Sequence, residues 1–331
     1  MLNFCGICGQ IAKTHHFGAV SCRACAAFFR RKVVIRNDII RRCNGKCDIS
    51  FGYRKLCPSC RMEKCLKAGM TKSKVVANNS ERMVLTRRFS KFYEHLHELR
   101  RVTFAIKVNH TPSMAYYKEV NEVFLKYGDL IKRNIFEPFP ETLTFPEEQL
   151  SLLLNNFTTP YIICEGVFRS DSYNIWKLPN DDLIDNDHPE YFYKENNDDV
   201  NGDKALEIYK SSWRVIQDNL RSRMVEANLD QNEFFLFSSL LFWDCGLHNQ
   251  SNKIAETCEK MRRKVLEELS EYENMKRSSV DAPLQVAKIV MILQGVQITL
   301  QTIHGTSGLA TVYDIYEHHK GMFKTMGIKK F

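Results

Sequence analysis

The sequence lacks the features that several large protein classes require. It has no internal repeat and no low-complexity tract, which excludes repeat architectures. The first ten residues have no basic start and no apolar run, so no secretory signal is expected. The most apolar stretch, residues 286–300, is interrupted by Lys288, Gln294 and Gln297, and it is shorter than the roughly 20 apolar residues of a membrane-spanning helix. We therefore expect no membrane partner.

Catalytic signatures are also missing. The sequence shows no phosphate-binding glycine loop, no nucleophile paired with a base and no open metal site. We therefore do not expect an enzyme.

Acidic residues are scarce in one part of the chain only. The 331 residues carry a net charge of +8, but residues 1–76 hold sixteen Lys and Arg against three Asp and Glu. The remainder has a small acidic excess. A basic segment joined to a mildly acidic one predicts a polyanionic partner for the first segment alone.

Cysteine is abundant where acidic residues are scarce, and its spacing is regular. The first quartet, Cys5, Cys8, Cys22 and Cys25, has two, thirteen and two residues between its members, and the second, Cys43, Cys47, Cys57 and Cys60, has three, nine and two. Pairs of cysteines separated by two residues offer two thiolates to one metal, and four thiolates close a tetrahedral zinc site with no open position. The spacing predicts two structural Zn²⁺ sites, which supply the folding free energy that a segment poor in aliphatic residues lacks. His15 and His16 are not expected to be ligands.

The segment around the fourth cysteine indicates the type of zinc module. Residues 22–32 read CRACAAFFRRK, and a helix beginning near Ser21 would bury Phe28 and Phe29 while its arginines face outward. Residues 57–66 read CPSCRMEKCL. Residues 5–76 resemble the DNA-binding domain of nuclear hormone receptors, in the form of the divergent nematode branch of that family. In the family the position of Cys65 is not a ligand, and we interpret it as core.

The resemblance implies a double-stranded DNA partner and a role for each basic residue. Helices of this kind enter the major groove, where Arg paired with guanine is the commonest base contact. The family usually has an acidic or small polar residue and a Lys where this chain has Arg23 and Ala26. We expect Arg23 to read a base. Phosphate contacts are expected from Arg30, Arg31, Arg54, Lys55 and Arg61. The loop between Cys43 and Cys47 is shorter than the dimerisation loop of the family.

The rest of the chain is predicted to be almost entirely helical. Residues 77–112 are interpreted as a basic hinge running into a helix. Its arginines, Arg100 among them, are expected to contact phosphates, to serve nuclear import or to form a solvated face. Residues 113–331 carry apolar residues at three- and four-residue steps. Thr144 is expected to cap a helix that Pro160 kinks or ends. A loop or a short strand region is expected around Tyr191, and further helices are expected over 281–303 and 307–322.

One stretch of the helical region carries a second resemblance. Residues 145–157, FPEEQLSLLLNNF, and 164–168, CEGVF, are similar to the signature of the receptor ligand-binding domain. This implies a small apolar ligand, with a pocket lined by the helices of 113–137, 147–168 and 284–303, although such a pocket looks like ordinary core in a sequence. The activation motif that closes the pocket in the family has no match after Gly321, so we expect no closing helix and weak ligand-driven activation.

Together these patterns predict a small zinc-stabilised α module with two four-cysteine sites, followed by an all-α three-layer helical sandwich. The predicted domains are 1–76, 77–112 and 113–331. The expected function is that of a zinc-dependent, sequence-specific transcription factor in the nucleus, an orphan receptor acting on RNA polymerase II transcription. Its expected partners include a receptor dimer partner or a corepressor. The alternative is a RING- or LIM-like protein-interaction module without specific DNA binding, in which the basic helix would have no use.

Overall fold

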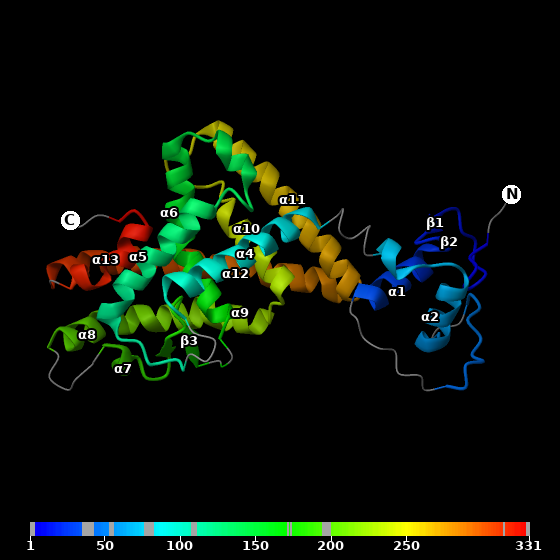
Figure 1. The fold of residues 1–331 in the computed structure, drawn as a ribbon, viewed down its shortest axis with the longest axis horizontal. Helices are drawn as coiled ribbons and strands as arrows, with labels where there is room; N and C mark the ends of the chain where they lie inside the picture. Colours follow the sequence, from blue (N-terminus) through cyan, green and yellow to red (C-terminus); the bar gives the residue numbers. More distant parts are fainter. Residues whose placement is uncertain are drawn as a thin grey trace. The chain divides into compact units, whose positions relative to one another are not determined.

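The computed structural model describes residues 4–34, 43–52, 56–75, 83–106, 111–170, 172, 174–193, 200–313 and 315–328. Two compact units emerge: residues 1–84 with 270–284, and residues 85–269 with 285–331. Figure 1 traces the order of their elements along the chain.

The first unit contains a small hairpin and the helices α1 and α2. Strands β1 (His15–His16) and β2 (Ala19–Val20) pair antiparallel and are followed by α1 (Arg23–Val34) and α2 (Pro58–Lys67). The hairpin turns through Phe17 and Gly18, both with positive φ, as a two-residue turn matched to strand twist requires. A Cβ at Gly18 would lie 2.5 Å from the carbonyl oxygen of Gly69, so this position needs glycine.

Helix α1 confirms the predicted orientation of the Phe pair. Phe28 and Phe29 are both buried, together with Cys65 on α2, in the core of this unit. Burial raises the pKa of the Cys65 thiol to about 12, so this thiol stays neutral at physiological pH. Cys65 is thus a core residue, as interpreted from the sequence.

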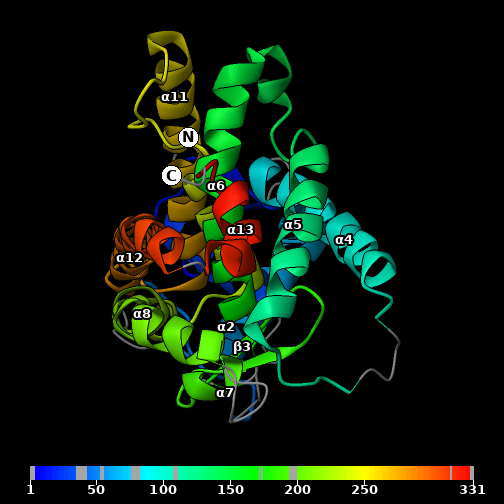
Figure 2. The same ribbon diagram turned by 90° about the vertical axis from the view of Figure 1, so that its left-hand side faces the viewer.

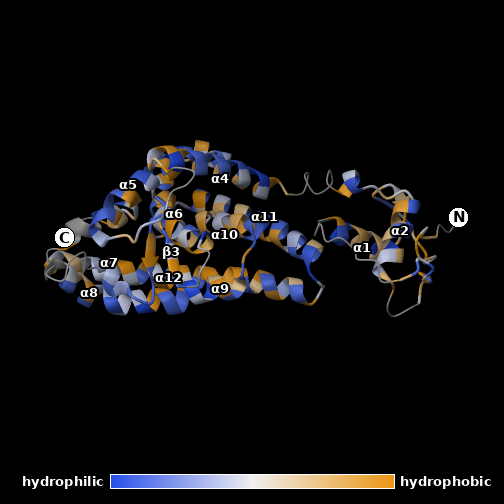
Figure 3. Cartoon of the chain, turned by 60° about the horizontal axis from the view of Figure 1, so that its bottom comes forward, coloured by the Kyte–Doolittle hydropathy of each residue, from blue (hydrophilic) through white to orange (hydrophobic). Residues whose placement is uncertain are grey.

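The second unit is a helical sandwich, as predicted. Figure 3 shows α4 and α5 in one layer, α6 and α10 in the middle, and α8, α9 and α12 in the third. Its elements are α4 (Val84–Thr103), α5 (Tyr117–Asn134), η1 (Pro140–Thr144), α6 (Glu147–Phe168), β3 (Ile175–Lys177), β4 (Leu183–Asp185), α7 (Pro189–Tyr193), α8 (Val200–Ile216), η2 (Gln217–Arg221), α9 (Ser222–Ala227), α10 (Gln231–Phe242), α11 (Asn252–Lys276), α12 (Asp281–Val312) and α13 (Tyr316–Thr325).

The core of this unit is rich in aromatic rings. Helix α10 is buried along nearly its whole length, as its continuous apolar sequence predicted, and a capping box between Asp230 and Glu233 starts it. Phe89 of α4 packs against Phe139 and Phe235, with ring centroids 6.0 and 5.4 Å apart. Helix α4, assigned from sequence to a hinge region, therefore shares this core.

A carboxylate from another helix accepts hydrogen bonds from the first backbone N–H groups of α4. Glu268 of α11 accepts hydrogen bonds from the backbone N–H of Leu85, at 3.0 Å, and of Thr86, at 2.8 Å. The same side chain accepts a 2.6 Å bond from the Thr86 hydroxyl. The first N–H groups of a helix have no partner within it, so this buried carboxylate replaces a local cap and ties α4 to α11.

Several local predictions in the middle of the unit were wrong. The strands lie at 175–177 and 183–185, and residues 189–193 form a short helix. Thr144 does not cap α6, because its hydroxyl donates to the Glu141 carbonyl within η1. Helix α6 continues through Pro160, so the proline does not end the helix, although proline costs about 3 kcal/mol inside a helix. Residues 157–167 are all buried, and we attribute the persistence of the helix to this packing.

The last two helices also differ from expectation. Helix α12 runs nine residues further than predicted, to Val312, and α13 follows it at Tyr316. Helix α12 is long and apolar enough to cross a membrane by length and composition, with 39% of the most apolar window buried. One such helix is weak evidence for a membrane protein, because core helices meet the same test.

Candidate functional site

The structure brings the first cysteine quartet together. The four sulfur atoms of Cys5, Cys8, Cys22 and Cys25 lie within 4.8 Å of one another, and all four residues are buried. The Sγ atoms of Cys8 and Cys22 are 3.7 Å apart. A tetrahedron with zinc–sulfur bonds of about 2.3 Å has edges of about 3.8 Å, so the donor set fits Zn²⁺. Cys5 and Cys8 lie in the turn that precedes the hairpin, Cys22 lies directly before α1 and Cys25 lies on it. Neither His15 nor His16 belongs to the cluster.

The second quartet has the same form but is less buried. The sulfur atoms of Cys43, Cys47, Cys57 and Cys60 also lie within 4.8 Å of one another, and Cys43 Sγ is 3.5 Å from both Cys57 Sγ and Cys60 Sγ. A backbone hydrogen bond from Cys60 and a side-chain bond from Cys43 lower the pKa of the Cys57 thiol to about 7. Side-chain hydrogen bonds with Cys60, Cys57 and Cys43 raise the pKa of the Cys47 thiol to about 12, so the four thiols titrate together.

Three predicted DNA-contacting residues follow one stripe of α1. Arg23 is exposed at the first position of the helix, and Arg30 and Arg31 follow seven and eight residues later, half-buried. That spacing places all three on one side of an α-helix. Phe28 and Phe29 are directed into the core. The predicted contacts Arg54 and Lys55 lie outside the described residues.

Arg61 is half-buried, as Arg30 and Arg31 are, and it contacts the first quartet and α1. One of its terminal nitrogens donates to Cys25 Sγ at 3.3 Å, and its guanidinium lies 4.6 Å from the centroid of the Phe28 ring. A donor on a zinc-binding sulfur reduces its negative charge. These contacts connect α2 to the first quartet, a role that the sequence did not indicate.

The helical unit contains a predominantly apolar cavity of about 110 Å³. Helices α5 and α6 line it as predicted, with Phe124 and Ile163, and α12 contributes Ile303. Trp176 of β3 and Trp213 of α8 also line it, from elements that the sequence prediction did not include. Their pattern in the sequence was that of ordinary core aromatics.

Helix α13 packs against α5, as Figure 2 shows, and also contacts α6. Met322 lines the cavity. The backbone N–H of Gly321 donates to the Asn121 side chain, and a Cβ at Gly321 would overlap the Asn121 carbonyl. Thr325 makes a hydroxyl contact with Thr159 of α6. The prediction that no helix closes this region was therefore wrong: a segment without the family's activation motif forms a closely packed helix.

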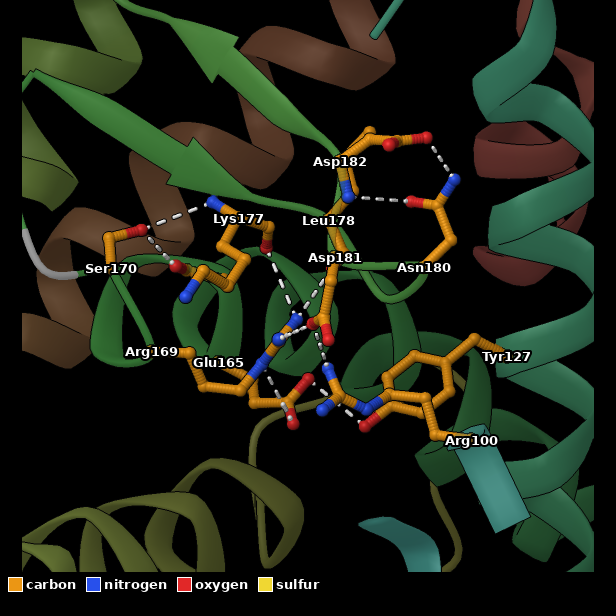
Figure 4. A network of polar contacts seen from close by, with 11 residues as sticks. Arg100, Tyr127, Glu165, Arg169, Ser170, Lys177, Leu178, Asn180, Asp181 and Asp182 are labelled. Atoms are coloured by element: carbon orange, nitrogen blue, oxygen red, sulfur yellow. Dashed lines mark hydrogen bonds and ion pairs between the residues drawn. The ribbon is translucent and has the colours of Figure 1, made fainter. Parts of the chain in front are cut away.

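A buried ionic network holds the β3–β4 turn beside the cavity (Figure 4). Asp181 accepts hydrogen bonds from Arg100 of α4, at 3.0 Å, and from Arg169, at 2.7 Å. Arg169 Nε lies 3.4 Å from a Glu165 carboxylate oxygen, and the Tyr127 hydroxyl donates to the other oxygen at 3.0 Å. Burial, together with the negative charge of Glu165, raises the pKa of Tyr127 well above its usual value.

This network corrects the interpretation of Arg100. Its side chain is only 3% exposed, so it belongs neither to a phosphate-binding cluster nor to a solvated face. A signal was present in the sequence, because Phe89, Phe92, Leu96 and Arg100 recur at three- and four-residue steps. An arginine on an apolar stripe indicates a buried, paired charge.

The fold and the sites define a class of protein: a DNA-binding module with two four-cysteine zinc sites, joined to a helical ligand-binding domain. Residues 3–72 match the family "Double treble clef zinc finger, C4 type", and residues 111–306 match "Ligand-binding domain of nuclear hormone receptor". The chain belongs to the nuclear hormone receptor family. Nothing in these matches indicates catalysis, and the two quartets are sites that could each bind a zinc ion.

Relatives in Caenorhabditis elegans match over nearly the whole chain. Nuclear hormone receptor family member nhr-42 is 34% identical, with 97% of each chain covered. Family member nhr-108 is 35% identical, with 94% of each chain covered. The protein nhr-176 is 33% identical over 94% of this chain and 92% of the relative. The resemblance seen in the cysteine and FFRR motifs thus extends through the helical unit.

Proposed function

We propose that this receptor is a transcription factor that acts in the nucleus and reads a specific DNA sequence through α1. The observation that carries the proposal is the exposed Arg23 at the start of α1, directly between Cys22 and the buried Cys25. Each quartet binds one Zn²⁺ through its four thiolates, and the first thereby fixes the helix that presents Arg23. Membership of the receptor family favours this function over a RING- or LIM-like module.

Selection of random oligonucleotides by the purified full-length protein, at a stated salt concentration, tests this function. We expect a consensus with a guanine at the position that Arg23 reads, because arginine donates two hydrogen bonds to the guanine edge in the major groove. Recovery of no consensus, with uniform salt-dependent binding to all sequences, would contradict sequence-specific recognition.

Substitution of two arginines on α1 should separate base reading from phosphate binding. Arg23→Ala should relax the consensus at one position and cost about 1–3 kcal/mol there. Arg31→Ala should weaken binding to all sequences alike and reduce the slope of log affinity against log salt by about one unit. Each variant serves as the control for the other in repeated selections and salt titrations. An unchanged consensus for Arg23→Ala would refute its assignment.

We propose that the cavity binds a small apolar molecule. At about 110 Å³ it is smaller than the roughly 300–1,000 Å³ typical of drug-sized ligands, and closer to a dry cavity of about 150 Å³ that binds benzene. The ligand is therefore small. Binding of a receptor dimer partner or of a corepressor stays a prediction, and no residues are assigned to either interface.

We propose further that α13 is docked whether or not a ligand occupies the cavity, so ligand drives activation only weakly. Its backbone bond to Asn121 and its contact with Thr159 involve no ligand, and among its residues Met322 lines the cavity. In the family the terminal helix docks over the pocket in response to ligand. Strong activation by a reporter fusion of residues 110–331 that requires an added apolar ligand, and that is abolished by deleting 322–331, would contradict this proposal.

The docking of α13 should depend on Gly321. Gly321→Ala places a methyl group against the Asn121 carbonyl, and overpacking of this kind costs about 1–3 kcal/mol. We expect hydrogen exchange of the amides of α13 to become about tenfold faster, measured by mass spectrometry. Lys324→Ala, on the exposed side of the same helix, is the control and should leave exchange unchanged. Unaltered exchange in Gly321→Ala would show that this contact does not hold the helix.

A further inference from the structure

Three segments of the sequence have the charge pattern that serine and threonine kinases of the basophilic class recognise. Each segment places two adjacent basic residues three and two positions before a hydroxyl group, and the three hydroxyl residues are Ser90, Thr103 and Ser279. The substrate groove of such a kinase is acidic and holds these basic side chains on an extended stretch of chain. A working acceptor therefore has to lie outside regular structure and to face solvent.

Two of the three segments lie within helix α4. Ser90 is half-buried in the middle of this helix, and it directly follows Phe89, which is in the core. Thr103 is the last residue of α4, and one of its two basic residues, Arg100, is 3% exposed and paired with Asp181. At either segment, binding to a kinase groove would require part of α4 to leave the core.

The third segment lies in the turn between α11 and α12. Helix α11 ends at Lys276 and α12 begins at Asp281, so Ser279 belongs to neither helix. Ser279 is exposed, and the residue after it, Val280, is 71% exposed. The second basic residue of the segment, Arg277, also lies outside α11. Of the three acceptors, Ser279 is the one that the fold leaves open to another enzyme.

The contacts within this turn distinguish Ser279 from its neighbour. Ser278 Oγ accepts a hydrogen bond from the backbone N–H of Asp281 at 3.1 Å and donates to the Asp281 carboxylate at 2.6 Å. The Ser279 hydroxyl has no hydrogen-bond partner among the described residues, so its modification breaks no contact. Arg277 pairs with Glu273 one turn earlier, and its side chain is still 28% exposed.

The reaction at this turn is the transfer of a phosphoryl group from ATP. The hydroxyl oxygen of Ser279 forms a bond to the γ-phosphorus as the bond from that phosphorus to the β–γ bridging oxygen breaks. ADP leaves, and the hydroxyl proton passes to the catalytic carboxylate of the kinase. The product carries a charge of about −1.5 to −2 and three strong acceptor oxygens where a neutral hydroxyl stood.

Within the first unit, which includes residues 270–284, Ser279 shares a surface hollow with two arginines of α1. The hollow has a volume of about 420 Å³, and Arg30, Arg31, Arg277 and Ser279 line it, with Glu271 as its acidic residue. Three guanidinium groups against one carboxylate make the hollow cationic. Guanidinium groups bind phosphate through paired, charge-assisted hydrogen bonds, and a phosphate placed opposite an arginine cluster forms one to three of them.

We propose that Ser279 is a phosphorylation site for a basophilic serine kinase, and that its phosphate binds Arg30 and Arg31 and thereby weakens DNA binding. The second part rests on the proposed function, in which α1 binds DNA and these two arginines contact its phosphates. Phosphoserine and DNA then compete for the same guanidinium groups. Because phosphate contacts do not depend on sequence, the modification lowers the affinity for all DNA alike and leaves the consensus unchanged.

Treatment of the full-length protein with ATP and the catalytic subunit of cyclic AMP-dependent protein kinase tests the acceptor. Mass spectrometry of the digested protein should find phosphate on Ser279 and none on Ser278, Ser90 or Thr103. Ser279→Ala should abolish the modification of this turn, and Lys276→Ala should slow it, because it removes one of the two charges that the kinase groove binds. Absence of phosphate from Ser279 would overturn the site, whatever the protein does with DNA.

Salt titrations of DNA binding before and after phosphorylation test the consequence. Loss of two phosphate contacts should reduce the slope of log affinity against log salt by about two units. At a fixed salt concentration the affinity should fall about tenfold or more. Kinase-treated Ser279→Ala is the matched control and should keep the slope and the affinity of the untreated protein.

A variant with Arg30→Ala and Arg31→Ala separates competition from simple repulsion. Phosphorylation should have no further effect on its DNA binding, whereas a phosphate that merely repels DNA would still weaken it. That second result, or an unchanged affinity of the phosphorylated natural sequence, would overturn the competition for the two arginines. Phosphate contacts act on any DNA, so the comparison holds without a consensus, and a failure of sequence-specific recognition is told apart from a failure of this inference.

Discussion

Removal of zinc from the full-length protein is expected to unfold residues 4–75 and to abolish DNA binding, while the helical unit stays folded. Zinc contributes about 10 kcal/mol or more per site to the folding of small zinc modules. The core of the first unit is built largely around the cysteines themselves. We expect no other interaction of comparable free energy to hold α1 in place once the metal leaves. The second unit, in contrast, has its own aromatic core around α10.

Metal analysis and a chelator titration measure this effect. We expect two zinc ions per chain, and loss of DNA binding in step with zinc release. Cys25→Ser should remove one ion and DNA binding together, because the first quartet fixes α1. Cys245→Ser, an exposed cysteine outside both quartets, is the matched control and should change neither. One zinc or none in the unmodified protein, or DNA binding that survives complete chelation, would refute the assignment of the ligands.

Loss of the Asp181 charge is expected to destabilise the helical unit by about 3 kcal/mol, because removing one partner of a buried ion pair leaves the other charge uncompensated. Asp181→Asn keeps the size of the side chain and tolerates the left-handed backbone at this position, where φ is 68°. It leaves the guanidinium groups of Arg100 and Arg169 with Glu165 as the remaining carboxylate of the network drawn in Figure 4.

Thermal unfolding of the helical unit checks this prediction. A loss of about 3 kcal/mol lowers the Tm of a domain of this size by about 6–12 °C. Asp129→Asn is the control, because Asp129 is 68% exposed and its oxygen lies 3.9 Å from Arg133, so its loss should cost at most about 1 kcal/mol. A change in Tm for Asp181→Asn no larger than that of the control would show that the network contributes little to stability.

The local chemistry of the zinc unit could be predicted from the sequence. Ligand spacing within each quartet fixes which sulfur atoms can meet, and the FFRR motif fixes which side of α1 is buried, because a helix converts spacing directly into direction. The same reasoning identified α10, whose continuous apolar sequence can only be buried. These features depend on contacts between residues close in the chain, or on one metal ion that joins them.

What the sequence left undetermined depends on residues far apart in the chain. Helix α6 passes through Pro160 where its neighbours are all buried, and α13 docks because Gly321 meets Asn121, two hundred residues earlier. The apolar stripe of α4 indicates that Arg100 is buried, but only the structure identifies its partner, Asp181 on another element. By itself the sequence determined the zinc sites, the orientation of α1 and the helical class. Only the tertiary structure decided the cavity and its lining, because pairing between distant elements leaves no periodic trace in the chain.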